Sequence, residues 1–250
     1  MTPLLEVLKL SKAFGGVKAV TQVSFSVAAG ELLAMIGPNG AGKSTCFNML
    51  NGQLRPDEGS IRLAGRELVG LAPREVWRMG VGRTFQITAT FGSMTVRENV
   101  QMALLSHHRA LVSAWMPAAE AFVAEADALL ERVGMREQAP RPCSILAYGD
   151  LKRLELAIAL ANAPKLLLMD EPTAGMGPLE RTELMMLTAR LVREQGVAVL
   201  FTEHDMDVVF RHADRLMVLN RGMLIAQGEP EMVRANAEVQ RVYLGSRSGS

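Results

Sequence analysis

Hydrophobic residues along the chain follow two spacings, one typical of strands and one typical of helices. Short apolar runs predict strands at residues 4–10, 23–27, 32–36, 60–63, 81–85, 166–170, 197–202, 216–220 and 223–227. Wider apolar spacing predicts helices at 73–79, 151–162 and 178–195, within 95–133, and in the tail from 230. Strands that alternate with helices in this way are typical of an α/β fold.

Composition supports a folded protein and excludes several function classes. The 250 residues are 49% hydrophobic, which is enough for one large α/β domain with an appended subdomain. Lys and Arg number 27 against 26 Asp and Glu, so a formal charge of +1 gives no indication of a nucleic acid partner. Two cysteines, Cys46 and Cys143, are too few for a disulfide framework or a metal site, which fits a reducing cytosol.

Neither a membrane span nor an export signal is expected. No apolar run approaches the roughly 18 residues that a membrane-spanning helix needs. The first ten residues lack a basic start, a long apolar core and a cleavage site. We therefore expect a chain that does not cross a membrane and is not exported by a signal peptide.

The strand predicted at 32–36 leads into a glycine-rich loop and then a helix, which is the context of a phosphate-binding loop. The loop consists of Gly37, Pro38, Asn39, Gly40, Ala41, Gly42, Lys43 and Ser44. Backbone N–H groups at glycines, at the positive end of a helix, can surround a phosphate closely. Lys43 is then placed to reach the β- and γ-phosphates, Ser44 to join a Mg²⁺ shell, and Thr45 to add a hydroxyl. The alternative is an ordinary Gly/Pro turn.

Two carboxylates, Asp170 and Glu171, end the apolar strand at 166–170. A continuous apolar run is typical of a strand buried in a parallel sheet, and ligands bind at the carboxyl ends of such strands. We therefore expect Asp170 to hold Mg²⁺, directly or through water, and Glu171 to polarise an attacking water. The alternative is an acidic pair that caps a helix.

Other polar residues also fall at predicted strand ends. His204 follows the strand at 197–202, where it can donate to the γ-phosphate and orient water, although a lone histidine is more often structural. Gln86 ends the strand at 81–85. Phe14, just before the turn at Gly15, is a candidate platform for stacking an adenine ring, with a core aromatic as the alternative.

In combination these motifs resemble the ATPase subunits of ATP-binding cassette (ABC) transporters over nearly the whole chain. The matching motifs are the phosphate loop 37–44, the Q-loop residue Gln86, the signature motif 146–150, the strand 166–170 with Glu171, and the switch histidine His204. The resemblance implies an α/β P-loop NTPase cassette with a RecA-like parallel-sheet core, an N-terminal antiparallel β-subdomain and an inserted α-helical subdomain. As one ABC ATPase domain over 1–250, it would comprise a core at 1–86 and 163–245, a helical subdomain at 87–162 and a flexible tail at 246–250.

The resemblance also implies an ATP-dependent dimer. Two cassettes close head to tail, and each ATP lies between the phosphate loop of one chain and the signature residues Ala147, Tyr148, Gly149 and Asp150 of the other. Gln86 would sense the nucleotide, contribute to Mg²⁺ binding and join the core to the helical subdomain. Ala147, Asp150 and Gly177 replace the usual serine, glutamine and aspartate; Asp150 adds negative charge near the site and is a candidate helix cap. These changes are not expected to inactivate the enzyme.

The sequence around the motifs is similar to that of cassettes from the branched-chain amino acid importer branch. The similar residues are 14–17, 83–86, 94–99, 146–149 and 202–206. Cassettes that serve the uptake of urea or short amides share much of this sequence. An exporter cassette of the lipopolysaccharide type is the alternative to an importer cassette. A soluble cassette acting on DNA or ribosomes is disfavoured, because the chain has one cassette, no sustained heptads and little net charge. The expected partners are a second cassette, identical or different, membrane permease subunits and, indirectly, a periplasmic solute-binding protein. The expected location is peripheral, on the cytoplasmic face of the inner membrane.

Overall fold

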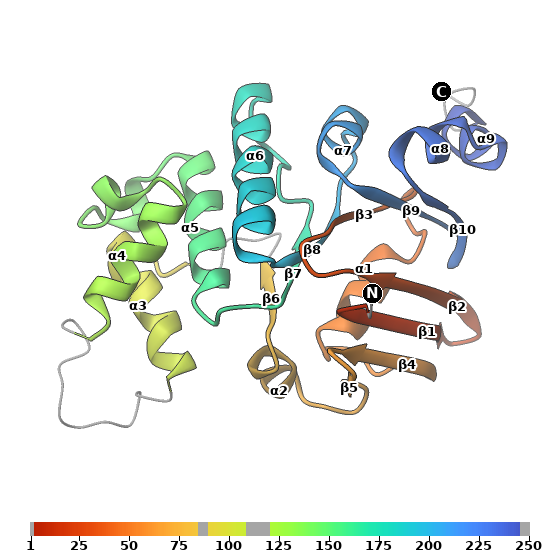
Figure 1. Cartoon of the computed structure of the whole chain (residues 1–250), viewed down its shortest axis with the longest axis horizontal. Coiled ribbons are helices and arrows are strands. Elements are labelled where there is room, and N and C mark those ends of the chain that lie inside the picture. The colour runs from red at the N-terminus through yellow and green to blue at the C-terminus, as the bar shows by residue number, and fades with distance from the viewer. Residues whose placement is uncertain (1–2, 85–89, 109–120, 246–250) are drawn as a thin grey trace.

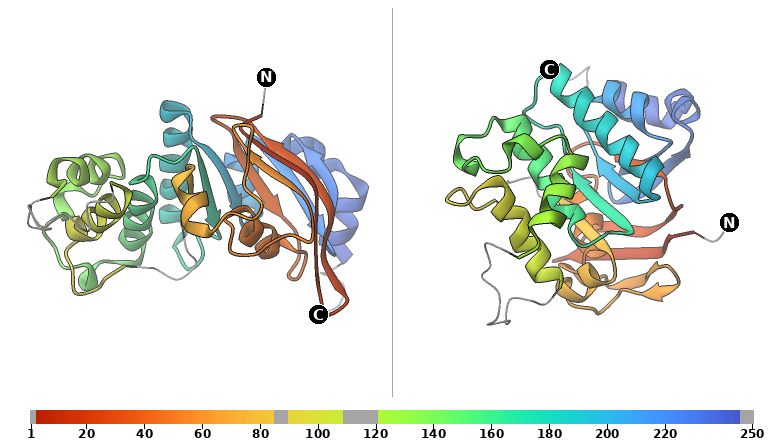
Figure 2. Two further views of the ribbon diagram at one scale, coloured as in Figure 1. Left: turned by 90° about the horizontal axis from the view of Figure 1, so that it is seen from below. Right: turned by 60° about the vertical axis from the view of Figure 1, so that its left-hand side comes forward.

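The computed structural model describes residues 3–84, 90–108 and 121–245 (Figure 1). A group of helices lies at one end of the molecule, and the N-terminal strands lie at the other. Between them a second sheet carries helices on its face, and the two views of Figure 2 show the same separation of helices from N-terminal strands. The predicted α/β fold is confirmed.

The central sheet has six strands in the order β10-β9-β3-β8-β7-β6. Its strands are β3 (Leu32–Ile36), β6 (Val81–Thr84), β7 (Leu166–Asp170), β8 (Ala198–Thr202), β9 (Arg215–Asn220) and β10 (Met223–Gly228). All neighbours pair in parallel except β10, which is antiparallel to β9. The parallel strands therefore all present their carboxyl ends at one edge of the sheet, as predicted for Asp170 and His204.

Both faces of this sheet are buried, which explains why its strands are continuously apolar. Along β3, Leu32, Ala34 and Ile36 pack into one hydrophobic cluster, together with side chains of the helices on that face. Leu33 and Met35 point the other way, into a second cluster that includes the N-terminal sheet. The alternation follows from the two-residue period of a strand.

The N-terminal sheet is antiparallel, with the strand order β2-β1-β4-β5. Its strands are β1 (Leu5–Phe14), β2 (Val17–Val27), β4 (Glu58–Leu63) and β5 (Arg66–Glu67). The first two strands are longer than predicted, because pairing continues to Phe14 and Val17 on either side of the glycine turn. Among the extra residues only Val20 is buried, and the mixture of polar and apolar side chains does not produce the apolar pattern from which strands are predicted.

Helix α1 (Lys43–Leu50) follows the glycine-rich loop and buries Phe47 and Leu50 in the cluster shared by the two sheets. Helix α2 (Pro73–Arg78) begins at a proline and precedes β6. Packing on both sheets fixes α1, and therefore the loop at its N-terminus.

The helical group contains α3 (Val96–His107), α4 (Val123–Arg132) and α5 (Tyr148–Leu160), with 3₁₀ turns η2 (Arg136–Gln138) and η3 (Cys143–Ile145). Thr95 caps α3: its hydroxyl accepts from the Glu98 N–H, and the Glu98 carboxylate accepts from the Thr95 N–H. Helix α5 begins at Tyr148, three residues before the predicted start at 151.

Helices α6 (Pro178–Gln195) and α7 (Met206–His212) complete the layer on the sheet, and α8 (Pro230–Ala235) and α9 (Ala237–Gly245) follow β10. Helix α6 starts at a proline and ends at Gly196, which has the left-handed φ of 67° that suits a glycine. In the part of the chain that the structure describes, every helix is too short or too polar to span a bilayer.

Candidate functional site

The site lies at the carboxyl edge of the central sheet, where a cavity of about 190 Å³ opens beside the glycine-rich loop. Its walls come from four parts of the chain: Ala19 in β2, residues 39–45 of the loop and α1, Glu171 after β7, and His204 after β8. The structure thus brings together the predicted phosphate loop, the predicted water-activating carboxylate and the predicted histidine.

Glycines in the loop allow it to lie close to neighbouring backbone. Gly37 and Gly42 have φ values of 154° and 103°. A Cβ at Gly37 would lie 2.2 Å from the Leu219 carbonyl oxygen, and one at Gly42 would lie 2.5 Å from that of Ala19. Gly42 is also the N-cap of α1, so the loop's N–H groups lie at the positive end of a helix, which favours an anion.

Lys43 is buried within the loop, with 8% of its surface exposed. Its Nζ donates to the carbonyl oxygens of Gly37 at 2.7 Å and Pro38 at 3.2 Å. Burial lowers the pKa of Lys43, and the nearby charges of Glu171 and Asp170 act in the opposite direction. The ammonium group therefore stabilises the loop itself in this conformation, at the base of the cavity.

Asp170 is held by two residues from neighbouring strands. Its Oδ1 accepts from the Thr202 hydroxyl at 2.7 Å, and its Oδ2 lies 3.4 Å from Arg83 Nη2. Arg83, in β6, also donates to Asn48 at 2.8 Å and to Gln53 at 2.9 Å. Sequence reasoning missed the role of Arg83 in the site; its signal is a guanidinium within a short, otherwise buried strand.

Glu171 and His204 are in direct contact, with 2.7 Å between Oε1 and Nε2. Glu171 has a left-handed φ of 48°, which costs on the order of 1 kcal/mol for a non-glycine residue. Its N–H donates at 3.0 Å to the hydroxyl of Thr202, the same hydroxyl that donates to Asp170. Thr202 thus fixes both acidic residues, and sequence reasoning missed it as well.

Oxygen ligands suitable for a hard cation are present in the hydroxyl of Ser44 and the carboxylate of Asp170. Among the described residues, no cluster of three His, Cys, Asp or Glu side chains forms a metal site by itself. Such an incomplete oxygen set suits Mg²⁺, which keeps several waters and is commonly bound by few protein groups together with substrate phosphates.

Phe14 is 49% exposed at the end of β1, so the alternative of a core aromatic is wrong for this residue. Lys12 Nζ lies 5.7 Å from the centroid of its ring. An exposed ring at this position is accessible for stacking on a base. Gln86 lies outside the described residues.

The signature residues lie at the start of α5, against the segment that follows Glu171. A Cβ on Gly175 would be 3.3 Å from the Tyr148 ring, and one on Gly149 would be 3.0 Å from Glu180 Oε1. Ala147 is the N-cap of α5, and Asp150 lies in the first turn of the helix. At this end of α5, which the structure describes, no side chain accepts a capping hydrogen bond. The prediction that Asp150 caps the helix is therefore wrong, because the helix starts before it.

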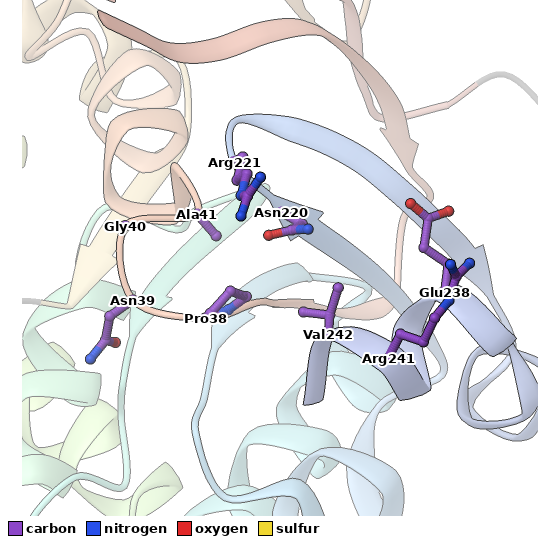
Figure 3. A pocket seen from close by; sticks show the side chains of 9 residues that line it. All are labelled: Pro38, Asn39, Gly40, Ala41, Asn220, Arg221, Glu238, Arg241 and Val242. Atoms are coloured by element: carbon purple, nitrogen blue, oxygen red, sulfur yellow. The ribbon is translucent and has the colours of Figure 1, made fainter. Parts of the chain in front are cut away.

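A second cavity, of about 500 Å³, lies beside the glycine-rich loop at Pro38–Ala41 (Figure 3). Asn220 at the end of β9 and Arg221 in the turn that follows it form another wall, and α9 contributes Glu238, Arg241 and Val242. Helix α9 therefore lies across this cavity from the phosphate-binding loop.

Two family patterns match the chain. The family described as "ABC transporter" matches residues 20–174, and the one described as "Branched-chain amino acid ATP-binding cassette transporter" matches residues 223–248. The first includes the glycine-rich loop and Glu171, and the second includes β10, α8 and α9.

Relatives match over nearly the full length. The chain is 43% identical over 250 residues to the high-affinity branched-chain amino acid transport ATP-binding protein LivG of Salmonella typhimurium, covering 97% of this chain and 98% of the relative. It is 42% identical to the corresponding protein BraF of Pseudomonas aeruginosa, with the same coverage.

Solved structures show the same fold. The ADP conformation of an ATP-binding cassette of an ABC transporter superposes with a TM-score of 0.88 at 31% identity, covering 98% of this chain and 100% of that one. A dimeric cassette in a post-hydrolysis state bound to ADP and Pi has a TM-score of 0.76 at 25% identity, covering 90% of this chain and 98% of that one.

Proposed function

Because the chain belongs to the family of ATP-binding cassette (ABC) transporter ATPases, we propose that its hydrolysis of ATP drives the uptake of branched-chain or other hydrophobic amino acids through a membrane permease. Full-length similarity to LivG and BraF supports this substrate class. The match of residues 223–248 to the family described as "Branched-chain amino acid ATP-binding cassette transporter" also supports it. Urea and short amides are the substrates that a test must distinguish from amino acids.

The 2.7 Å contact between Glu171 and His204, beside the phosphate-binding loop, carries the hydrolytic part of the proposal. Loop N–H groups and Lys43 bind the β- and γ-phosphates, and Thr45 adds a hydroxyl. Lys43 exchanges its bonds with the carbonyl oxygens of the loop for bonds with phosphate oxygens. Glu171 accepts a proton from water in line with the γ-phosphate, and His204 orients that water and donates to the phosphate.

Ser44 and Asp170 are the proposed protein ligands of Mg²⁺, with Gln86 as a further ligand outside the described residues. Mg²⁺, when bound, offsets negative charge on the phosphates. Thr202 and Arg83 keep the Asp170 carboxylate oriented toward this position through the hydrogen bond and ion pair described above. Phe14 stacks on the adenine ring.

A complete site requires a second cassette, of the same or a different chain. Residues 147–150 of one chain cover the γ-phosphate bound to the other, and the N-terminus of α5 favours that anion. The dimeric solved relative supports this arrangement. The core comprises 1–86 and 163–245 and the helical subdomain 87–162. Closure rotates this subdomain against permease subunits, at the cytoplasmic face of the inner membrane, while a periplasmic protein delivers the solute.

Uptake in vesicles that contain the chain and its permease subunits tests the proposal. Glu171→Gln is expected to retain ATP binding while hydrolysis and uptake of radiolabelled leucine fall by about 100-fold or more, because the amide cannot accept the proton of water. ATP affinity, phosphate release and leucine uptake are measured on the same preparations.

Glu183→Gln is the matched control, because Glu183 pairs with Arg153 on α5 rather than lining the cavity. It should keep both hydrolysis and uptake. Near-normal hydrolysis by Glu171→Gln would contradict the role of that carboxylate. Inhibition of leucine uptake by excess urea or short amides, but not by valine, would contradict the substrate class.

A further inference from the structure

Glu171 and His204 belong to loops that follow different strands, β7 and β8, and 33 positions separate them in the sequence. Their side chains are 24% and 48% exposed. A contact between partly exposed side chains competes with water and gains little stability by itself. The separation of the two groups must therefore be set by the backbones that carry them.

Glu203, the residue before the histidine, lies between these two backbones and is only 5% exposed. Its Oε1 accepts from the Thr173 N–H at 3.0 Å and from the Thr173 hydroxyl at 2.5 Å. Its Oε2 accepts from the His204 N–H at 3.1 Å. One buried carboxylate thus binds the chain two residues after Glu171 and the backbone of His204 itself.

We propose that Glu203 is a positioning residue for ATP hydrolysis, which holds the loop of Glu171 and the loop of His204 at a fixed separation. An ionised carboxylate only accepts hydrogen bonds, and this one has three donors from the two loops. Because the group is buried, water does not compete for these bonds, and they hold the backbone more firmly than the exposed contact does. This inference rests on the proposed hydrolytic function.

A second connection joins the same loops farther from the cavity. Arg181 in α6 donates to the Met176 carbonyl at 2.8 Å and to Asp205 at 2.7 Å. Asp205 also caps α7 by accepting from the N–H groups of Asp207 and Val208. The segment after Glu171 is therefore joined to both neighbours of His204, directly to Glu203 and through Arg181 to Asp205. Of these two connections, the one at Glu203 also binds the His204 backbone.

Glu203→Gln, in the full chain, breaks one connection without changing the size of the side chain. The amide has one acceptor oxygen and one NH₂ group, and an NH₂ group cannot accept from an N–H. Whichever way the amide turns, the bond from one backbone N–H, that of His204 or that of Thr173, is lost. We expect kcat for ATP hydrolysis to fall by about 10- to 100-fold, while the dissociation constant for ATP changes by less than about twofold.

Glu31→Gln is the matched control at the opposite end of the central sheet. Glu31 also accepts from a backbone N–H, that of Ala28 at 2.6 Å, and it pairs with Arg215 at 2.7 Å. The same chemical change there removes a partly buried carboxylate outside the site. It should lower stability to thermal unfolding and leave kcat within about twofold of the unchanged chain.

The NMR signal of the His204 imidazole separates positioning from a purely structural role. The chain has four histidines, and the His204 signal is identified by its loss in His204→Ala. The signal should move in Glu203→Gln and stay in place in Glu31→Gln. An unchanged kcat or an unchanged His204 signal in Glu203→Gln would overturn the inference, and so would a parallel loss of ATP affinity, which indicates general disruption of the site.

Failure of the proposed function gives a different result. If the unchanged chain binds ATP but does not hydrolyse it with Mg²⁺ at any protein concentration, the hydrolytic function itself fails. If the unchanged chain hydrolyses ATP, Glu171→Gln does not, and Glu203→Gln matches the unchanged chain, only the positioning role of Glu203 fails.

Discussion

At the scale of single residues, the site depends on side chains that each form hydrogen bonds with two other residues. The Thr202 hydroxyl accepts from the Glu171 N–H and donates to Asp170, while Glu203 joins Thr173 to His204. Each such group is buried or partly buried, where hydrogen bonds are strong and an unpaired donor is costly. Conservative substitutions at these positions should therefore alter the geometry of the site more than they alter the overall fold.

His212, at the end of α7, makes stability depend on pH. Its Nε2 is buried with no hydrogen-bond partner among the described residues. Burial, and then the positive charges of Arg211 and Arg193, lower the pKa of His212 below its usual 6.5. The unfolded chain therefore takes up a proton at a higher pH than the folded chain, so the free energy of unfolding should fall as the pH drops below 6.5.

Urea denaturation at pH about 7.5 and about 5.5 checks this prediction. His212→Gln should lose less stability over this interval than the unchanged chain, because glutamine does not titrate. An equal loss in both proteins would contradict the assignment of this pH dependence to His212.

At the scale of elements, proline and glycine predict the ends of a helix correctly where the tertiary packing is compatible with those ends. Pro178 and Gly196 define both ends of α6 as predicted. Helix α5 instead begins at Tyr148, before the predicted start, and continues into the sheet layer with Leu154, Leu156 and Ala157 buried. In the phosphate-binding loop, close approach to β2 and β9 makes specific glycines necessary.

Gly42→Ala tests this requirement by comparison with Gly65→Ala, because Gly65 also has a positive φ but has no close neighbour. Gly65 has a φ of 77° and nothing within 4 Å of its Cβ position, whereas Gly42 faces the Ala19 carbonyl at 2.5 Å. Left-handed backbone costs a non-glycine residue roughly 1–2 kcal/mol, which both variants share. The clash should make Gly42→Ala at least about 1 kcal/mol less stable than Gly65→Ala.

Chemical denaturation of the two variants measures the difference directly. ATP binding should be lost only in Gly42→Ala, since Gly65 lies in the turn between β4 and β5. Equal stabilities would show that the loop relaxes without cost, contrary to the role of close packing.

At the scale of the whole molecule, the described site is open and one-sided. The phosphate-binding loop, Glu171 and His204 line the cavity, while Tyr148 and Gly149 of the same chain lie against Gly175 and Glu180. Ala147 and Tyr148 are exposed and Gly149 is buried, and the signature residues do not line the cavity of their own chain.

Hydrolysis should therefore depend on chain concentration. Below the dissociation constant of the dimer, the fraction of paired chains rises with concentration, and specific ATPase activity should rise with it. Activity per chain is measured over a dilution series at saturating ATP and Mg²⁺, alone and with the companion cassette. Constant activity per chain, in samples that remain monomeric by light scattering, would contradict a site shared between two chains.

The sequence by itself determined the α/β class, the phosphate-binding loop and the strand-end positions of Asp170, Glu171 and His204. It did so because the periodicity of apolar residues and the spacing of glycines are local properties. It also indicated the family, since ordered motifs retain their spacing along the chain. The start of α5 and the lengths of β1 and β2 were predicted wrongly, because pairing and packing extend elements past their apolar pattern.

Only the tertiary structure decided which side chains meet. Arg83 and Asp170 are 87 positions apart, and Thr173 and Glu203 are 30 apart, yet each pair is in contact because β6, β7 and β8 are neighbours in the sheet. Strand order and register are set by the burial of both sheet faces as a whole, and no local pattern contains them. Asp170, Glu171 and His204 were predicted from the chain, whereas the roles of Arg83 and Thr202, whose hydrogen bonds orient the two carboxylates, follow from the packing of distant strands.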